Sequence, residues 1–140
     1  MNILVTGGCG FIASNLIEFI LESNFPDVER VVNLDIVTYA GDMDNTKTFA
    51  DHDKYFFEKV NLIDTASLYS VFSRHNITHV IHLAAESHVD NAIESPDAFM
   101  TSNIIGTHNL LKFARKFGVK RFHHVSTDEV YGELGDTGKF

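Results

Sequence analysis

The chain has 140 residues, which suits one domain that is long enough to bury a core. Its formal net charge of −8 argues against nucleic-acid binding, because a phosphate backbone is bound by clustered lysine and arginine. The apolar runs are too short for a membrane span and no secretory signal is visible; the single cysteine, Cys9, favours a reducing, cytoplasmic compartment.

Strand and helix patterns alternate along the chain. We expect strands over residues 2–6, 30–35, 55–60, 78–83 and 120–126, and helices over 11–22, 64–75 and 96–117. Asp64 is expected to cap the second helix and Gly118 to end the third. Residues 36–53 are polar and irregular, with a short helix expected around 44–49. The alternation predicts an α/β domain with right-handed crossovers, a parallel sheet of order 3-2-1-4-5 and helices on both faces.

A glycine-rich turn, Gly7-Gly8-Cys9-Gly10-Phe11-Ile12-Ala13, separates the first strand from the first helix. Gly7, Gly10 and Ala13 have the spacing of dinucleotide-binding turns: the first permits a tight turn, the second lets the backbone approach a pyrophosphate, and the third lets the helix pack against the sheet. The start of the helix supplies N–H groups to phosphates. The alternative is a purely structural turn, and Cys9 is expected to be a small turn residue rather than a redox switch.

Asp35 ends the second expected strand, about 20 residues after the glycine-rich turn. An acid at this place hydrogen-bonds the ribose hydroxyls of an adenine dinucleotide and favours NAD over NADP. No arginine follows Asp35 to bind a 2′-phosphate. The alternative is a solvent-exposed aspartate at the end of a strand.

Small residues follow the fourth expected strand, in the run His82-Leu83-Ala84-Ala85-Glu86-Ser87-His88. Small side chains there let a bulky ligand lie against the backbone. Glu86 and Ser87 are expected beside it, with Ser87 within reach of a substrate; for Glu86 a structural role is an equal alternative. Asn103, in the following helical stretch, is expected to hydrogen-bond the backbone of the neighbouring strand.

Thr127, Asp128 and Glu129 follow the fifth expected strand, where an open α/β sheet lines its ligand crevice. A hydroxyl and two adjacent carboxylates at this place indicate acid–base chemistry. Alternate residues of a strand point to opposite faces, so the two carboxylates converge only if the strand ends near Ser126 and the chain turns. The alternative is a polar loop that carries two acids.

A metal site is not predicted. The chain has eight histidines, but none lies in a His-Glu-x-x-His arrangement and no cysteine pair exists to complete a zinc site.

Together these motifs resemble the extended short-chain dehydrogenase/reductases, and within them the dTDP-glucose 4,6-dehydratase family. The resemblance covers the whole chain and rests on Thr6 to Ile12, Thr38-Tyr39-Ala40-Gly41, His82 to Asp90, and Ser126 to Gly132. It implies an NAD-binding Rossmann-type domain over residues 1–140. The last motif is the most specific, since related sugar-nucleotide epimerases usually lack its Asp-Glu pair.

The resemblance implies NAD as cofactor and a nucleotide sugar as substrate. Hydride leaves C4 of the sugar, the resulting 4-ketone acidifies the C5 hydrogen, water is eliminated across C5 and C6, and hydride returns to C6. By the family pattern, Asp128 is the acid that protonates the departing hydroxyl, Glu129 is the base, and Thr127 hydrogen-bonds at O4. The two carboxyl groups then need different protonation states.

The resemblance also implies the binding residues. Ser87 and Thr127 are expected to contact substrate. Asn61 stands where an aspartate commonly reads the adenine amino group, and its carbonyl oxygen can still accept. The residues expected to bind NAD are Gly7, Gly10, Phe11, Ile12, Ala13, Asp35, Ile36, Val37, Thr38, Asn61, Leu62, Leu83, Ala84, Ala85 and Ser102.

The family's Tyr-x-x-x-Lys pair, which removes the O4 proton and positions the nicotinamide, is expected beyond residue 140. Tyr131 does not supply it, because Gly-Glu-Leu-Gly follows. We therefore expect a fragment that lacks the last strands and the substrate domain and is inactive alone, from an enzyme that is a homodimer. The alternatives are a fragment of a UDP-glucose 4,6-dehydratase or of a sugar-nucleotide 4-epimerase, or a non-catalytic nucleotide-binding module.

Overall fold

A computed structural model describes residues 1–132 and 135 of the chain; the rest of the expected domain lies outside the described residues. Its strands form one parallel sheet of order β3-β2-β1-β4-β5, as predicted. The strands are β1 (Asn2–Thr6), β2 (Arg30–Asp35), β3 (Tyr55–Lys59), β4 (His79–His82) and β5 (Arg121–His124). Thr6 is in register with both Leu34 and His82, so three carboxyl ends lie level at one edge of the sheet.

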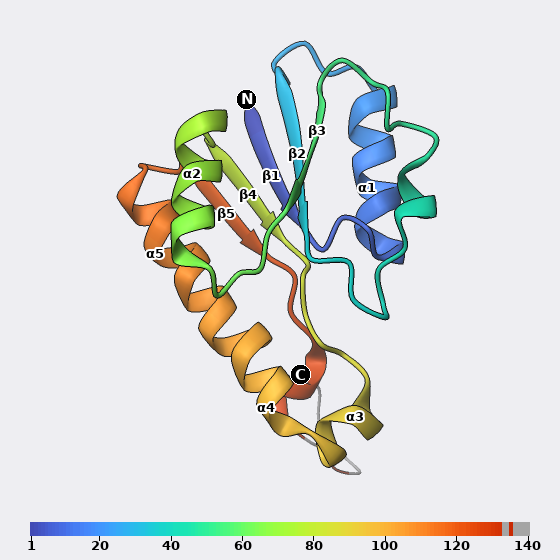
Figure 1. Cartoon of the computed structure of the whole chain (residues 1–140), viewed down its shortest axis with the longest axis vertical. Helices are drawn as coiled ribbons and strands as arrows, with labels where there is room; N and C mark the ends of the chain where they lie inside the picture. Colours follow the sequence, from blue (N-terminus) through green and yellow to red (C-terminus); the bar gives the residue numbers. More distant parts are fainter. Residues whose placement is uncertain (133–134, 136–140) are drawn as a thin grey trace.

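Helices cover both faces of the sheet, which confirms the predicted architecture (Figure 1). Helix α1 (Phe11–Glu22) lies on one face, and α2 (Thr65–His75) and α5 (Thr107–Lys116) lie on the other. The helical segments that remain are η1 (Met43–Thr46), α3 (Val89–Glu94), α4 (Pro96–Phe99), the π-helical η2 (Met100–Gly106) and the 3-10 turn η3 (Asp128–Tyr131). No helix among the described residues is long and apolar enough to cross a bilayer.

Two apolar layers flank the sheet because successive side chains of a strand point to opposite faces. Leu4 packs with Phe72 in the layer beneath α2 and α5, whereas Val5 packs with Ile17 in the layer beneath α1. All four side chains are fully buried. The middle of the sheet is therefore fixed from both sides, and the loops at its carboxyl edge start from a rigid base.

The ends of two helices follow the predicted signals. The Asp64 carboxylate accepts the backbone N–H groups of Ala66 and Ser67, both at 3.1 Å, and so caps α2. The Ser67 hydroxyl and these N–H groups hold the pKa of Asp64 below its usual value. Gly118 follows α5 with a φ of +67°, the left-handed conformation that ends helices.

Several segments differ from the predicted pattern. The helix expected over 96–117 is three segments, because residues 100–106 widen into a π-helix. Helix α3 was not predicted; it has six residues, too few for a clear periodic pattern. The fourth strand ends at His82 rather than Leu83, since the Leu83 N–H donates to the Thr6 hydroxyl instead of a neighbouring strand. The short helix near residue 44 is the 3-10 turn η1.

Candidate functional site

A cavity of about 390 Å³ lies at the carboxyl edge of the sheet, beside the ends of β1, β2, β3 and β4. The strand order reverses direction between β1 and β4, and an open α/β sheet binds its ligand at such a switch point. Every residue expected to bind NAD lines it except Val37, and Ser87 lines it too. The lining residues that had not been singled out are Leu34, Ala40, Gly41, Val60 and Val125.

Sequence carried a signal for most of these additional residues. Leu34 and Val60 each precede a predicted site residue, and Ala40 and Gly41 belong to a motif that already carried the family resemblance. Val125 has no such signal: it reaches the cavity only because β5 lies beside β4 in the sheet.

The glycine-rich turn brings β1 and the exit of β4 into close contact. Gly7 has a φ of +74°, and its N–H donates to the Leu34 carbonyl at 2.9 Å. A Cβ on Gly7 would lie 2.9 Å from both Cα and N of Ala84, which is closer than real side chains come. Gly7 is therefore needed for its backbone conformation and for the close approach of two backbones.

The start of α1 faces the cavity, and its backbone N–H groups are not hydrogen-bonded by a capping side chain. Gly10 occupies the N-cap, and no side chain in the described chain caps this end of the helix. The first-turn residues Phe11 and Ile12 line the cavity. Free N–H groups and the helix dipole make this end of the cavity suited to an anion such as a phosphate.

Asp35 organises the opposite wall of the cavity. One carboxylate oxygen accepts the Cys9 N–H at 3.0 Å and the other accepts the Val37 N–H at 2.7 Å. Val37 has a φ of +57°, a rare conformation for a β-branched residue. Val37 therefore forms the turn after Asp35 and does not line the cavity; its contact with the cofactor stays a prediction.

Cys9 is a buried part of the turn, as expected. Burial raises the pKa of its thiol to about 11, with a further contribution from the Asp35 charge. The neighbouring Gly8 packs on Asn33: a Cβ there would lie 2.1 Å from the Asn33 Oδ1. The thiol is neutral at physiological pH, which does not suit a redox switch.

Side chains rather than a strand ladder hold the loop that follows β4. The Thr6 hydroxyl accepts the backbone N–H groups of Leu83, at 3.2 Å, and Ala84, at 3.1 Å. Further along, Asn103 accepts the Glu86 N–H and donates to the Glu86 carbonyl, both at 2.8 Å. The predicted structural role of Asn103 is thus present, on the loop beyond the strand.

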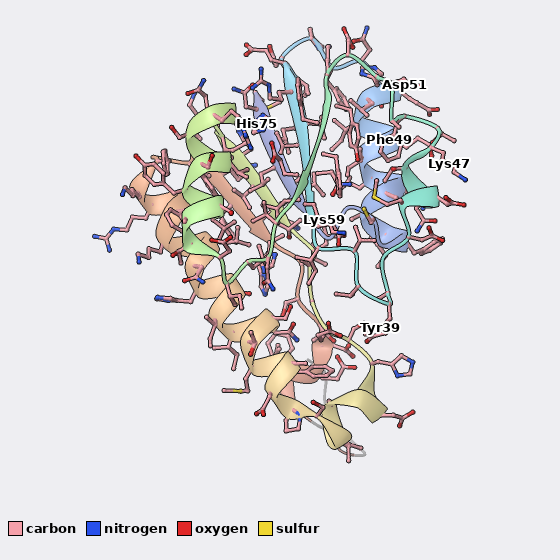
Figure 2. All side chains as sticks on the ribbon, viewed as in Figure 1. Tyr39, Lys47, Phe49, Asp51, Lys59 and His75 are labelled. Carbon is pink, nitrogen blue, oxygen red and sulfur yellow. The ribbon has the colours of Figure 1, made fainter. Side chains whose placement is uncertain are left out.

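Tyr39 and Glu86 form a bridge at the rim of the cavity. The Tyr39 hydroxyl donates to the Glu86 carboxylate at 2.9 Å. Tyr39 lies below the carboxyl edge of the sheet in Figure 2, in the loop after β2, whereas Glu86 lies in the loop after β4. Two loops far apart in the sequence are therefore joined across the site.

The Thr127-Asp128-Glu129 segment meets the geometric condition for convergence, because β5 ends at His124 and the chain turns into η3. All three residues are exposed, and none of them lines the cavity. Val125 connects this segment to the cavity. The catalytic roles of the three residues stay predictions.

One tyrosine and lysine do have the Tyr-x-x-x-Lys spacing, but on strand β3. The Asn33 amide donates to the Tyr55 hydroxyl at 2.9 Å, and burial raises the pKa of Tyr55. Tyr55 and Lys59 are about 13 Å apart along an extended strand, and Lys59 lies at the exposed end of β3 (Figure 2). This pair is not arranged for proton abstraction.

Within the described residues, no three His, Cys, Asp or Glu side chains lie close enough together to hold a metal ion. The start of α1, which no described side chain caps, suits a ligand that carries phosphate at that end of the cavity.

Comparison with known proteins points to one family. The family model described as GDP-mannose 4,6 dehydratase matches residues 4–139. The dTDP-glucose 4,6-dehydratase of Neisseria gonorrhoeae is 46% identical over an alignment that covers 97% of this chain and 41% of the relative. That of Salmonella typhimurium is 42% identical over 96% of this chain and 39% of the relative.

Solved structures agree in fold. The dTDP-glucose 4,6-dehydratase of Streptomyces venezuelae, crystallised with NAD bound, has a TM-score of 0.92 at 38% identity, covering 100% of this chain and 43% of that one. The UDP-glucose 4-epimerase of Thermotoga maritima has a TM-score of 0.84 at 33% identity, covering 98% of this chain and 41% of that one.

The chain spans about two-fifths of the length of the relatives it matches. Because the family match extends over nearly all of its residues, the chain belongs to the GDP-mannose 4,6 dehydratase family.

Proposed function

We propose that this chain is the NAD-binding part of a dTDP-glucose 4,6-dehydratase, a lyase that converts dTDP-glucose to dTDP-4-keto-6-deoxyglucose. The observation that carries the proposal is the cavity, which joins a glycine-rich turn, an uncapped helix start and Asp35 at the switch point of the sheet. The identity to dTDP-glucose 4,6-dehydratases over nearly the whole chain supports this choice of substrate.

The residues of the cavity fit a dinucleotide. The start of α1 suits the pyrophosphate, and Asp35 suits the adenosine ribose. Asn61 lies on the same wall and offers a carbonyl oxygen to the adenine, although it also accepts the Ile63 N–H at 3.1 Å. Leu83, Ala84 and Ala85 leave room for the nicotinamide end. When bound, NAD supplies the hydride acceptor.

Thr127, Asp128 and Glu129 are proposed to act on the sugar. Asp128 protonates the departing C6 hydroxyl, Glu129 removes the C5 proton, and Thr127 and Ser87 hydrogen-bond the substrate. Support comes from their place: the chain leaves β5 through Val125, which lines the cavity, and turns at once into the segment that carries both acids. In the family pattern, the O4 proton is taken by a Tyr-x-x-x-Lys pair, which Tyr55 and Lys59 do not supply.

A second candidate is a sugar-nucleotide 4-epimerase, favoured by the close fold match to the Thermotoga maritima enzyme. The adjacent Asp128 and Glu129 argue against it, since epimerisation needs no elimination of water. UDP-glucose is an alternative substrate, and a non-catalytic nucleotide-binding module is an alternative role. We also propose a homodimeric full-length enzyme and, from the single buried cysteine, a cytoplasmic location.

Calorimetric titration of the chain with NAD⁺ and with NADP⁺ tests the cofactor. We expect NAD⁺ to bind more tightly, because the Asp35 carboxylate repels a 2′-phosphate. Equal affinities would count against the assignment of Asp35. Titrating the complete, NAD-loaded enzyme with dTDP-glucose and with UDP-glucose then tests which nucleotide sugar is preferred.

The elimination step is tested in the complete enzyme with Asp128→Asn. Loss of the acid should slow elimination by roughly 10²- to 10⁴-fold while 4-ketone formation continues. Asp53→Asn, on an exposed carboxylate in the loop before β3, is the matched control. Loss of both steps together in Asp128→Asn would show that Asp128 is not specific to elimination.

A further inference from the structure

The buried histidine at the end of β4 is not accounted for by the proposed chemistry. His82 is 1% exposed, and both of its ring nitrogens are hydrogen-bonded. Its Nδ1 lies 2.7 Å from the Thr6 hydroxyl on β1, and its Nε2 lies 2.9 Å from the Thr107 hydroxyl at the start of α5. One imidazole therefore joins β1, β4 and α5 directly behind the cavity.

The Thr6 hydroxyl determines which ring nitrogen carries the proton. A hydroxyl has one proton and two lone pairs. The N–H groups of Leu83 and Ala84 both donate to this oxygen, so its lone pairs are taken. Its proton is left to bond Nδ1, which must then be an acceptor. In a neutral imidazole the remaining proton is on Nε2, where it donates to Thr107.

The groups held in this way line the cavity. Leu83 and Ala84 are lining residues, and the Ala84 backbone is the surface against which Gly7 fits without room for a Cβ. The β1–β4 ladder ends at the Thr6–His82 pair, so beyond it the Thr6 hydroxyl replaces a strand as the acceptor. The position of this wall thus depends on the direction in which Thr6 donates.

We infer that His82 is a positioning residue for the cofactor: its neutral Nε2–H form orients the Thr6 hydroxyl, which fixes the Leu83–Ala84 backbone against which the dinucleotide lies. This inference rests on the proposed function in so far as the ligand is NAD. His82 does not touch the cavity and acts through Thr6. A protonated ring would present a second donor to Thr6, whose lone pairs are already occupied.

The surroundings of the ring oppose its protonation. Burial lowers the pKa of His82 to about 4, and His124 on β5 contributes further. The His124 ring lies 5.0 Å away between centroids, and the Phe122 ring lies 6.2 Å away. His124 is the titratable group packed on His82 among the described residues; the contacts from β1 and α5 are neutral hydroxyls.

Nitrogen NMR of the wild-type chain at pH 7 tests the tautomer without any cofactor. We expect His82 to show an unprotonated Nδ1 and a protonated Nε2, unchanged between pH 8 and pH 5.5, whereas a histidine in a peptide titrates near 6.5. The variant His108→Gln removes an exposed histidine of α5. The signals that disappear belong to His108, and the His82 signals should be unchanged. An Nδ1–H tautomer, or an imidazolium in this range, would overturn the inference whatever the NAD⁺ affinity is.

Affinity measurements test the positioning role. Thr6→Val keeps the shape of the side chain but leaves two N–H groups and Nδ1 unpaired, so the folded chain should bind NAD⁺ about tenfold more weakly or worse. Thr6→Ser keeps the hydroxyl and should restore both affinity and tautomer.

Wild-type affinity in folded Thr6→Val, or failure of Thr6→Ser to restore it, would show that the network only supports the fold. If Thr6→Val does not fold, Thr107→Val gives a second test: the Thr6 hydroxyl still donates to Nδ1, so the Nε2–H tautomer of His82 should persist although Nε2–H has lost its acceptor. Appearance of an Nδ1–H tautomer in Thr107→Val would show that Thr6 does not set the tautomer and would overturn the inference. Failure of the wild-type chain to bind NAD⁺ would instead count against the proposed function, and the tautomer would still be read independently.

Discussion

The two halves of the candidate site are built in different ways. The cavity is bounded by the level ends of three central strands, and buried side chains such as Thr6 and His82 lie behind it. The segment with Asp128 and Glu129 is a short exposed turn after β5, which is the edge strand of the described sheet. Substitutions in the cavity should therefore change stability and binding together, whereas substitutions in the segment should change chemistry alone.

Gly7→Ala should have the largest effect on the cavity. The new Cβ meets the Ala84 backbone at 2.9 Å and the residue is held at a positive φ, so we expect a loss of about 2–4 kcal/mol in the free energy of unfolding and no measurable NAD⁺ binding. Gly118→Ala is the matched control, because its φ is also positive but a Cβ there meets no atom within 4 Å. Equal losses in urea unfolding of the two variants would show that the close approach at Gly7 is unimportant.

Asp35→Asn should weaken NAD⁺ binding by about tenfold, because charge-assisted hydrogen bonds to ribose hydroxyls are lost. The asparagine oxygen can keep only part of the bonding to the Cys9 and Val37 N–H groups, so a smaller loss of stability should accompany it. Calorimetry with NAD⁺ and NADP⁺ measures both affinity and selectivity. Unchanged selectivity would place the ribose elsewhere in the cavity.

The buried imidazole should make stability depend on pH. An unfolded histidine has a pKa of about 6.5, whereas the pKa of folded His82 is lowered to about 4. As pH falls from 6.5 toward 4, the unfolded chain takes up a proton that the folded chain does not, so stability falls, by on the order of 2 kcal/mol. Urea unfolding at pH 7 and pH 5 measures the slope. His82→Gln should be less stable at pH 7 and show a smaller pH dependence; an unchanged slope would assign the dependence to other groups.

Asp128→Asn and Glu129→Gln should have the smallest effects on this chain. Both side chains are exposed, so stability should change by less than about 0.5 kcal/mol and NAD⁺ affinity should not change. Thermal unfolding and calorimetry measure both quantities. A large loss in either would show that the segment is part of the cavity after all and would remove the contrast between the two halves.

Sequence predicts the parts of this molecule that depend on local pattern. The bounds of β1, α1 and β2 are as expected, and the glycine-rich turn and Asp35 line one cavity. Contacts between distant segments were not predictable: the Thr6 hydroxyl replaces the ladder beyond His82, and a left-handed turn removes Val37 from the lining. The π-helix was not predicted, because the apolar pattern of its residues is that of a continuous α-helix.

Chemical modification of the single cysteine can report how often the glycine-rich turn opens to solvent. Cys9 is fully buried in the turn where phosphate is proposed to bind, and its high pKa keeps the thiol unreactive until the turn opens to solvent. The rate at which a thiol reagent modifies it therefore reports the free energy of local opening at that turn. A ligand that binds only the closed turn must slow this modification in proportion to its occupancy, so occupancy of the cavity can be followed without any catalytic turnover.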